Sequence, residues 1–152
     1  MRRKRFVGVC VATLAATVTL AAAGSAGASA GTPVTISGQT IFGNGFGTFT
    51  TSPGSGLCAS GITTDIVSVS GGQSNNHILF HNIKTFTCDD GSGTFTLKLE
   101  VMLVFGNSAD SFSWTVTSGT GAYTNLHGTG QGVGLELPGE VDDSYTGSVH
   151  FN

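Results

Sequence analysis

The segment Thr94–Phe105, TFTLKLEVMLVF, alternates apolar side chains with polar or charged ones along most of its length. Successive side chains of a β-strand point to opposite faces of the sheet, so one face of this segment is apolar. That face consists of Phe95, Leu97, Leu99, Val101, Leu103 and Phe105. The segment therefore predicts a strand with one buried side and one wetter side.

The same alternation recurs after residue 30, and no segment there shows the sustained 3.6-residue period of an amphipathic helix. We predict eight strands: Val34–Phe42, Phe46–Thr50, Ile62–Ser70, His77–Cys88, Gly93–Phe105, Ser111–Ser118, Leu126–Leu137 and Ser144–Phe151. Turn-forming residues separate nearly all of them, and several short loops favour antiparallel neighbours. We expect an all-β fold, an eight-stranded antiparallel up-and-down barrel, because closure removes exposed edges. A two-sheet β-sandwich is the alternative.

The first 30 residues have the three parts of a secretory signal peptide. A basic stretch, Met1–Arg5, precedes an uncharged apolar run, Phe6–Ala23, and small residues follow up to Ala30. The apolar run could just span a bilayer, but alanine, glycine and threonine dilute it and an Ala-x-Ala site follows. We predict cleavage after Ala30, a secreted protein, and one β-barrel domain over residues 31–152 with no integral membrane segment.

Cleavage would make the chain strongly acidic. Four of its six basic residues lie in the first 30 positions, which leaves two lysines against nine acids, for a net charge of −7 and no arginine. Nucleic-acid binding requires clusters of lysine and arginine to neutralise phosphates, and anionic membranes would repel this surface. We therefore expect no nucleic-acid partner, and the acidity itself favours solubility.

Cys58 and Cys88 are the two cysteines that remain after cleavage. An isolated pair in an exported chain is typical of a disulfide. The loop between them would stabilise the fold by about 3–4 kcal/mol in the chain-entropy model. Two free thiols are the alternative, and the absence of a Cys-x-x-Cys spacing argues against a metal site.

The segment Gly119–Gly130, GTGAYTNLHGTG, is the most distinctive internal stretch. A phosphate-binding glycine loop must lead into a helix N-terminus, whereas these glycines lead into strand-like alternation, and the P-loop lysine is missing. We interpret the segment as a tight turn that lets Tyr123 and Leu126 pack inward, followed by a strand whose glycines permit bending.

These motifs resemble the allene oxide cyclase and dirigent barrel families and small exported bacterial proteins related to them. The match consists of Trp114-Thr115-Val116, Gly119–Tyr123, the Leu-x-Gly-x-Gly of 126–130, Phe86–Phe95 and Asp143–Gly147. The resemblance implies an eight-stranded antiparallel barrel that can form homo-oligomers. Cyclases of this group hold an oxylipin in an apolar cavity and dirigent proteins hold phenoxy radicals, but no residue here matches their cavity polar groups.

Four histidines are candidate metal ligands by residue type: His77, His81, His127 and His150. The first two would lie about 13 Å apart along one strand, too far to share a zinc ion. A zinc site would therefore need His127 or His150 from another strand. We expect no metal and no cofactor.

Paired acids suggest calcium or glycosidase chemistry. Asp89-Asp90-Gly91 lacks the ligand spacing of a calcium loop and indicates a hairpin turn, and Asp142-Asp143 is interpreted as leading from a turn into the last strand. A weak surface calcium site built from both pairs is the alternative. Glycosidase work would require the fold to bring together two of Glu100, Glu136 and Glu140.

Serine catalysis has no supporting pattern, because Ser55 and Ser92 lie in glycine-rich turns rather than in a nucleophile elbow. Most aromatic residues are expected to fill the barrel as core rather than to line a ligand site. This set is Phe42, Phe46, Phe80, Phe86, Phe95, Phe105, Phe112, Trp114, Tyr123 and Phe151.

No residue is assigned to catalysis or to ligand binding from the sequence. The leading hypothesis is an exported, non-enzymatic barrel that binds a small apolar molecule or acts at the cell surface. One alternative is a cyclase- or dirigent-like enzyme that uses the barrel cavity, and another is a structural or adhesive surface protein. An open cavity with a convergent polar group would favour the first two, and a barrel plugged by its phenylalanines the third.

Overall fold

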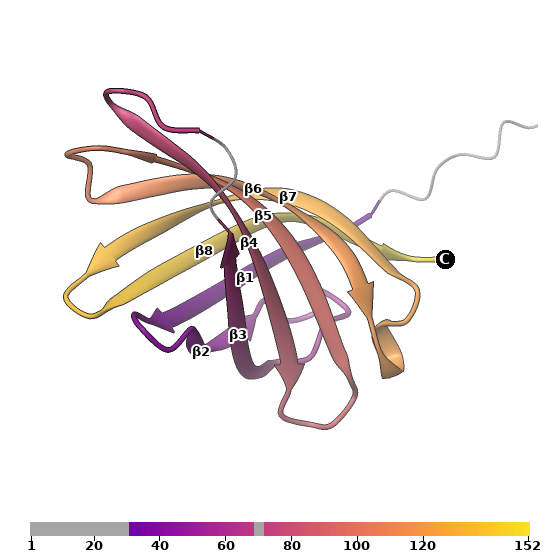
Figure 1. Cartoon of the computed structure of the whole chain (residues 1–152). Helices are drawn as coiled ribbons and strands as arrows, with labels where there is room; N and C mark the ends of the chain where they lie inside the picture. Colours follow the sequence, from indigo (N-terminus) through magenta and orange to yellow (C-terminus); the bar gives the residue numbers. More distant parts are fainter. Residues whose placement is uncertain (1–30, 69–71) are drawn as a thin grey trace, which may run out of the picture.

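The computed structural model describes residues 31–68 and 72–152, which form a closed barrel of eight antiparallel strands (Figure 1). The strands are β1 (Thr32–Ile41), β2 (Phe46–Thr51), β3 (Ser60–Ser68), β4 (His77–Cys88), β5 (Thr94–Val104), β6 (Ala109–Gly119), β7 (Leu126–Leu137) and β8 (Glu140–Phe151). Each strand pairs with the next, and β8 pairs with β1 from Thr32↔Val149 to Ile41↔Glu140. The predicted up-and-down barrel is confirmed and the sandwich alternative is wrong. The predicted cleavage after Ala30 lies outside the described residues.

Strand boundaries follow the sequence pattern within two residues, except at the start of β8. This strand begins at Glu140 rather than Ser144, because Pro138 and Gly139 alone make the turn between β7 and β8. Gly139 adopts a φ of +90°, a conformation that glycine tolerates, and Leu137 pairs directly with Glu140. Asp142 and Asp143 therefore lie within β8, and the prediction that they lead into this strand from a turn is wrong.

Aromatic rings fill one end of the barrel. Phe86 and Phe95 stack with ring centroids 4.7 Å apart, and Phe49 meets Phe86 edge-on at 5.0 Å. The short 3₁₀ helix η1 (Gly121–Tyr123) places Tyr123 over this end, with its ring 5.5 Å from that of Phe95. Such edge and stacked contacts add to the stabilisation from burial, so this end is a packed core rather than a channel.

A disulfide joins Cys58, in the loop before β3, to Cys88 at the end of β4, with a Cα–Cα distance of 5.9 Å. Both cysteines are buried in the same aromatic cluster. The bond therefore ties the β2–β3 loop to the plugged end of the barrel.

The glycines of β7 make room for aromatic rings. A Cβ atom on Gly132 would lie 2.2 Å from the Phe112 ring, and one on Gly130 would lie 2.5 Å from the Trp114 ring. Both distances are far shorter than van der Waals contact, so only glycine lets these rings lie against the β7 backbone. Bending was the role expected from the sequence, and close packing is the one that the structure shows.

The aromatic set expected in the core divides in two. Phe86, Phe95, Phe112, Trp114 and Tyr123 are buried, and Phe80 packs partly buried against them. The prediction is wrong for four rings that are about half exposed: Phe42, Phe46, Phe105 and Phe151. All four lie at or just beyond strand ends, and Phe46 is also on the outward face of β2.

Candidate functional site: a polar-based pocket at the open end

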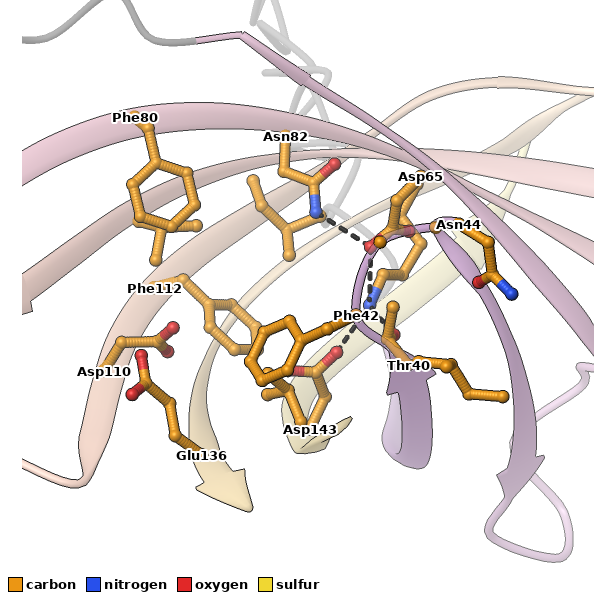
Figure 2. Close-up of a pocket in the computed structure, with 17 residues that line it drawn as sticks. Thr40, Phe42, Asn44, Asp65, Phe80, Asn82, Asp110, Phe112, Glu136 and Asp143 are labelled. Atoms are coloured by element: carbon orange, nitrogen blue, oxygen red, sulfur yellow. Dashed lines mark hydrogen bonds and ion pairs between the residues drawn. The ribbon is translucent and has the colours of Figure 1, made fainter. Parts of the chain in front are cut away.

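A pocket of about 470 Å³ opens at the end of the barrel opposite the aromatic core (Figure 2). The β1–β2 turn lies at its rim. Its apolar wall consists of side chains from β4, β5, β6 and β8: Phe80, Leu99, Val101, Phe112 and Val141. A site of this size and lining is typical of small-molecule binding pockets.

Lys84 lies at the base of the pocket and is only 2% exposed. Its Nζ lies 2.5 Å from Asp143 Oδ2 and 3.4 Å from Asp65 Oδ2, and it donates a hydrogen bond to Thr40 Oγ1 at 3.0 Å. A buried ammonium is costly unless it is paired and hydrogen-bonded. Three strands, β1, β3 and β8, supply those partners to a lysine on β4.

Two further polar groups hold the carboxylates in place. The Tyr145 hydroxyl donates to Asp143 Oδ2 at 3.1 Å, and Asn82 Nδ2 donates to Asp65 Oδ2 at 3.1 Å. Burial and the neighbouring Asp143 carboxylate raise the pKa of Tyr145 well above its ordinary value, so this phenol stays a donor. Burial also raises the pKa of Asp65, although the charge of Lys84 opposes that effect.

Two oxygen atoms in this network have no hydrogen-bond partner within residues 31–68 and 72–152. They are Asp65 Oδ1 and Asn82 Oδ1, and both residues line the pocket. The side chain of Asp65 is 7% exposed and Asn82 as a residue is 7% exposed. Buried acceptors without donors are rare in proteins, so the base of the pocket carries an unusual surplus of acceptor atoms.

Asp110 on β6 and Glu136 on the neighbouring strand β7 lie side by side at the mouth of the pocket (Figure 2). Asp110 Oδ1 accepts a hydrogen bond from the Gly134 N–H at 3.0 Å. Partial burial raises the pKa of Asp110 to about 6, and the nearby charges of Asp143 and Glu136 act in the same direction. A carboxyl group that titrates near neutral pH in a pocket is suited to binding a cation or to moving a proton.

Phe42, Phe80 and Phe112 line the pocket, although the aromatic set was expected to form core rather than a ligand site. The other residues singled out from the sequence lie elsewhere, with two exceptions. Cys58 and Cys88 form the expected disulfide, far from the pocket in the aromatic core. Asp89 and Asp90 lie in the β4–β5 hairpin turn, as predicted: Asp89 Oδ2 accepts from Ser60 Oγ, and Asp90 Oδ1 accepts from the Ser92 N–H. Hydrogen bonding with the Ser92 side chain, followed by that with its backbone N–H, lowers the pKa of Asp90.

Asp143 and Glu136 are the exceptions, but neither plays the expected role. The surface calcium hypothesis is wrong, because Asp143 points into the barrel and is paired with Lys84. Glu136 approaches Asp110 rather than another glutamate, and Glu100 lies on the outer face, where it accepts from Lys98 at 3.1 Å. The pair of glutamates that glycosidase chemistry would need is therefore not brought together at the pocket.

The histidines and serines lie outside the pocket. His127 and His150 stack across β7 and β8 with ring centroids 5.4 Å apart, while His77 is hydrogen-bonded to Ser74 and Asn76. Within the described ranges, no group of three or more histidine, cysteine, aspartate or glutamate side chains could hold a metal ion. Ser55 Oγ accepts from the Leu57 N–H, and Ser92 Oγ lies 3.2 Å from the Tyr123 hydroxyl.

Sequence reasoning missed Lys84, Asp65, Asn82 and Asp110. A usable signal was nevertheless present, because three charged residues lie two positions before a core aromatic residue: Lys84 before Phe86, Asp110 before Phe112 and Asp143 before Tyr145. Residues two apart in a strand share a face, so each of these charges had to point inward.

Comparison of the chain with protein-family models, curated proteins and solved structures found no match. In the part of the chain that the structure describes, no helix is long and apolar enough to span a bilayer.

Proposed function

We propose that the protein is an exported, non-enzymatic barrel that binds a small, mainly apolar molecule in the open-end pocket. The observation that carries this proposal is the pocket itself: about 470 Å³ of space with an apolar wall and polar groups converging at its base. This combination gives a ligand both buried apolar contact and a fixed orientation.

The pocket is suited to binding because it is preformed. Its wall lies on paired strands, and the polar base is held by contacts among Lys84, Asp65, Asp143 and Tyr145. A site that needs no rearrangement loses less entropy on binding. The resemblance to the cyclase and dirigent barrels supports the same use of the fold, since those proteins also hold ligands in their barrels.

A direct test uses Nile red, a neutral apolar dye whose fluorescence rises in apolar surroundings. Wild-type protein should bind it, and Val141→Phe should lose binding because the larger ring fills the pocket. Thr146→Phe adds the same ring on the outer face of the same strand and should bind as the wild type does. Equal binding by all three proteins would place the dye elsewhere and overturn the proposal.

A second candidate function is proton-transfer catalysis in the same pocket. The observation that favours it is the pKa of about 6 at Asp110, which is near the value that a general acid or base needs. An Asp110→Asn variant that still binds a ligand recovered with the protein, but no longer converts it, would identify an enzyme. A ligand recovered chemically unchanged after prolonged incubation with wild-type protein would favour the binder.

Export is tested by the intact mass of the protein secreted into the medium. A chain that begins at residue 31 and is lighter than the reduced form by two hydrogen atoms is expected. A chain that retains residues 1–30 would contradict export by a cleaved signal.

A further inference from the structure

The charge of the open-end pocket indicates the class of molecule that it selects, an inference that rests on the proposed binding function. Four carboxyl groups line the pocket, those of Asp65, Asp110, Glu136 and Asp143, and a single lysine, Lys84, faces them. Lys84 is paired with both Asp65 and Asp143. Asp110 and Glu136 at the mouth have no cationic partner in the described part of the chain, so the site has a surplus of negative charge.

The base of the pocket has more hydrogen-bond acceptors than donors, which also favours a ligand that donates. Asn82 donates its amide N–H to Asp65, which fixes the amide orientation and leaves Asn82 Oδ1 as an acceptor. Asp65 Oδ1 is a second acceptor without a donor among the described residues. These two acceptors add to the negative potential at the pocket base, which favours a ligand that carries donor groups over a ligand with only acceptors.

The apolar wall suits the rest of such a ligand. Phe80 and Phe112 present aromatic rings on the same side of the pocket as Asp110 and Glu136 (Figure 2). Leu99 and Val101 also line the pocket. Aromatic faces attract cations in addition to excluding water, so the rings and the carboxylates favour the same kind of group.

We propose that the pocket selects a small amphipathic cation, whose apolar body lies against Phe80 and Phe112 and whose protonated amine faces Asp110 and Glu136. The net charge of the barrel domain acts in the same sense, because an acidic protein steers cations toward it. An anionic ligand of the same shape would meet like charges at the mouth and is disfavoured.

The test compares three probes that share an indole ring: tryptamine, tryptophol and indole-3-acetate. They present an ammonium, a hydroxyl and a carboxylate on similar short chains. Dissociation constants are measured calorimetrically on residues 31–152 with the disulfide formed, at about pH 7.5, where the primary amine is protonated. Tryptamine is expected to bind about tenfold more tightly than tryptophol, and indole-3-acetate most weakly.

Two double variants test whether Asp110 and Glu136 cause the preference for tryptamine over tryptophol. In the wild type, the dissociation constant of tryptophol is expected to be about ten times that of tryptamine. In Asp110→Asn/Glu136→Gln this ratio should fall to between about one and three. The control Glu100→Gln/Asp142→Asn removes the same net charge from the outer face and should retain the wild-type preference.

Three other results would contradict either the selection of a cation or the binding function itself. Equal binding of tryptamine and tryptophol would refute selection of a cation and leave the pocket as a binder of small apolar molecules. Tightest binding of indole-3-acetate would refute it in favour of recognition by Lys84. No binding of any probe, together with no binding of Nile red, would refute the proposed function itself.

Discussion

At the scale of single residues, Lys84 is the side chain on which the barrel interior most depends. Its ammonium is buried between two carboxylates, and removing it would leave Asp65 and Asp143 buried without a counter-charge. We predict that Lys84→Met lowers the free energy of unfolding by about 3–5 kcal/mol, as measured by urea denaturation at neutral pH.

A compensating variant separates lost charge balance from lost packing. Lys84→Met/Asp65→Asn/Asp143→Asn removes all three charges and should regain most of the stability that Lys84→Met loses, because uncharged groups cost less to bury. A triple variant less stable than Lys84→Met would show instead that the carboxylates are stabilised mainly by their hydrogen bonds from Asn82 and Tyr145 rather than by the charge of Lys84.

Asp110 gives the protein a pH dependence whose sign follows from its raised pKa. Its pKa of about 6 lies above the ordinary value of 3.8, so between these two pH values the folded protein binds more protons than the unfolded chain. The contribution of Asp110 to stability is therefore full below about pH 4 and is lost as the pH rises through about 6.

We predict that Asp110→Asn raises the free energy of unfolding by about 1–2 kcal/mol at neutral pH, after allowance for partial exposure, with a smaller effect near pH 4. The asparagine Oδ1 can still accept from the Gly134 N–H, so the fold is preserved. Urea denaturation at both pH values measures the difference. An increase that is larger at the acidic pH would show that the carboxyl group is not destabilised by burial.

At the scale of elements, β7 shows why glycine is placed where a strand would usually hold a larger residue. Gly132 lies against Phe112, and the ring occupies the space of the missing side chain. We predict that Gly132→Ala lowers the free energy of unfolding by about 1–3 kcal/mol, because overpacking forces the ring or the backbone to move.

Gly38 on β1 provides a matched control. A Cβ atom there would meet its nearest neighbours at 3.7 Å, which is ordinary contact, and Gly38 does not have a positive φ. Gly38→Ala should therefore leave stability unchanged or raise it by about 0.5–1 kcal/mol, through the lower entropy of the unfolded chain. If thermal denaturation showed equal losses for both variants, crowding by Phe112 would not be the cause.

The strands could be predicted from the sequence because alternation is a local property. β4 and β7 begin and end where the pattern places them. The start of β8 could not be predicted in the same way, because the acidic pair at 142–143 suggests a surface turn when charges are assumed to be solvated. The pocket depends on partners up to 59 residues apart, as in the contact between Lys84 and Asp143. Such pairings follow from barrel closure and register, which no local pattern contains.

At the scale of the whole molecule, the features that stabilise the fold and the pocket proposed to bind a ligand lie at opposite ends of one barrel. The aromatic core and the disulfide occupy one end, and the pocket with its charged base occupies the other. Leu99, Val101 and Phe112 belong to both the core cluster and the pocket wall, but the stacked rings of the plugged end and the two cysteines do not line the pocket. A change at the disulfide should therefore alter stability much more than affinity.

The disulfide tests this division of roles. Closing 30 residues of sequence separation should stabilise the fold by about 3–4 kcal/mol, so Cys58→Ser/Cys88→Ser should unfold at a correspondingly lower urea concentration. Well below its unfolding midpoint, the same variant should bind Nile red with a dissociation constant within about threefold of the wild type, because neither cysteine lines the pocket. A large loss of affinity in a variant that is still folded by circular dichroism would mean that the plugged end holds the pocket walls in place. In that case the barrel would act as one cooperative unit for binding as well as for folding.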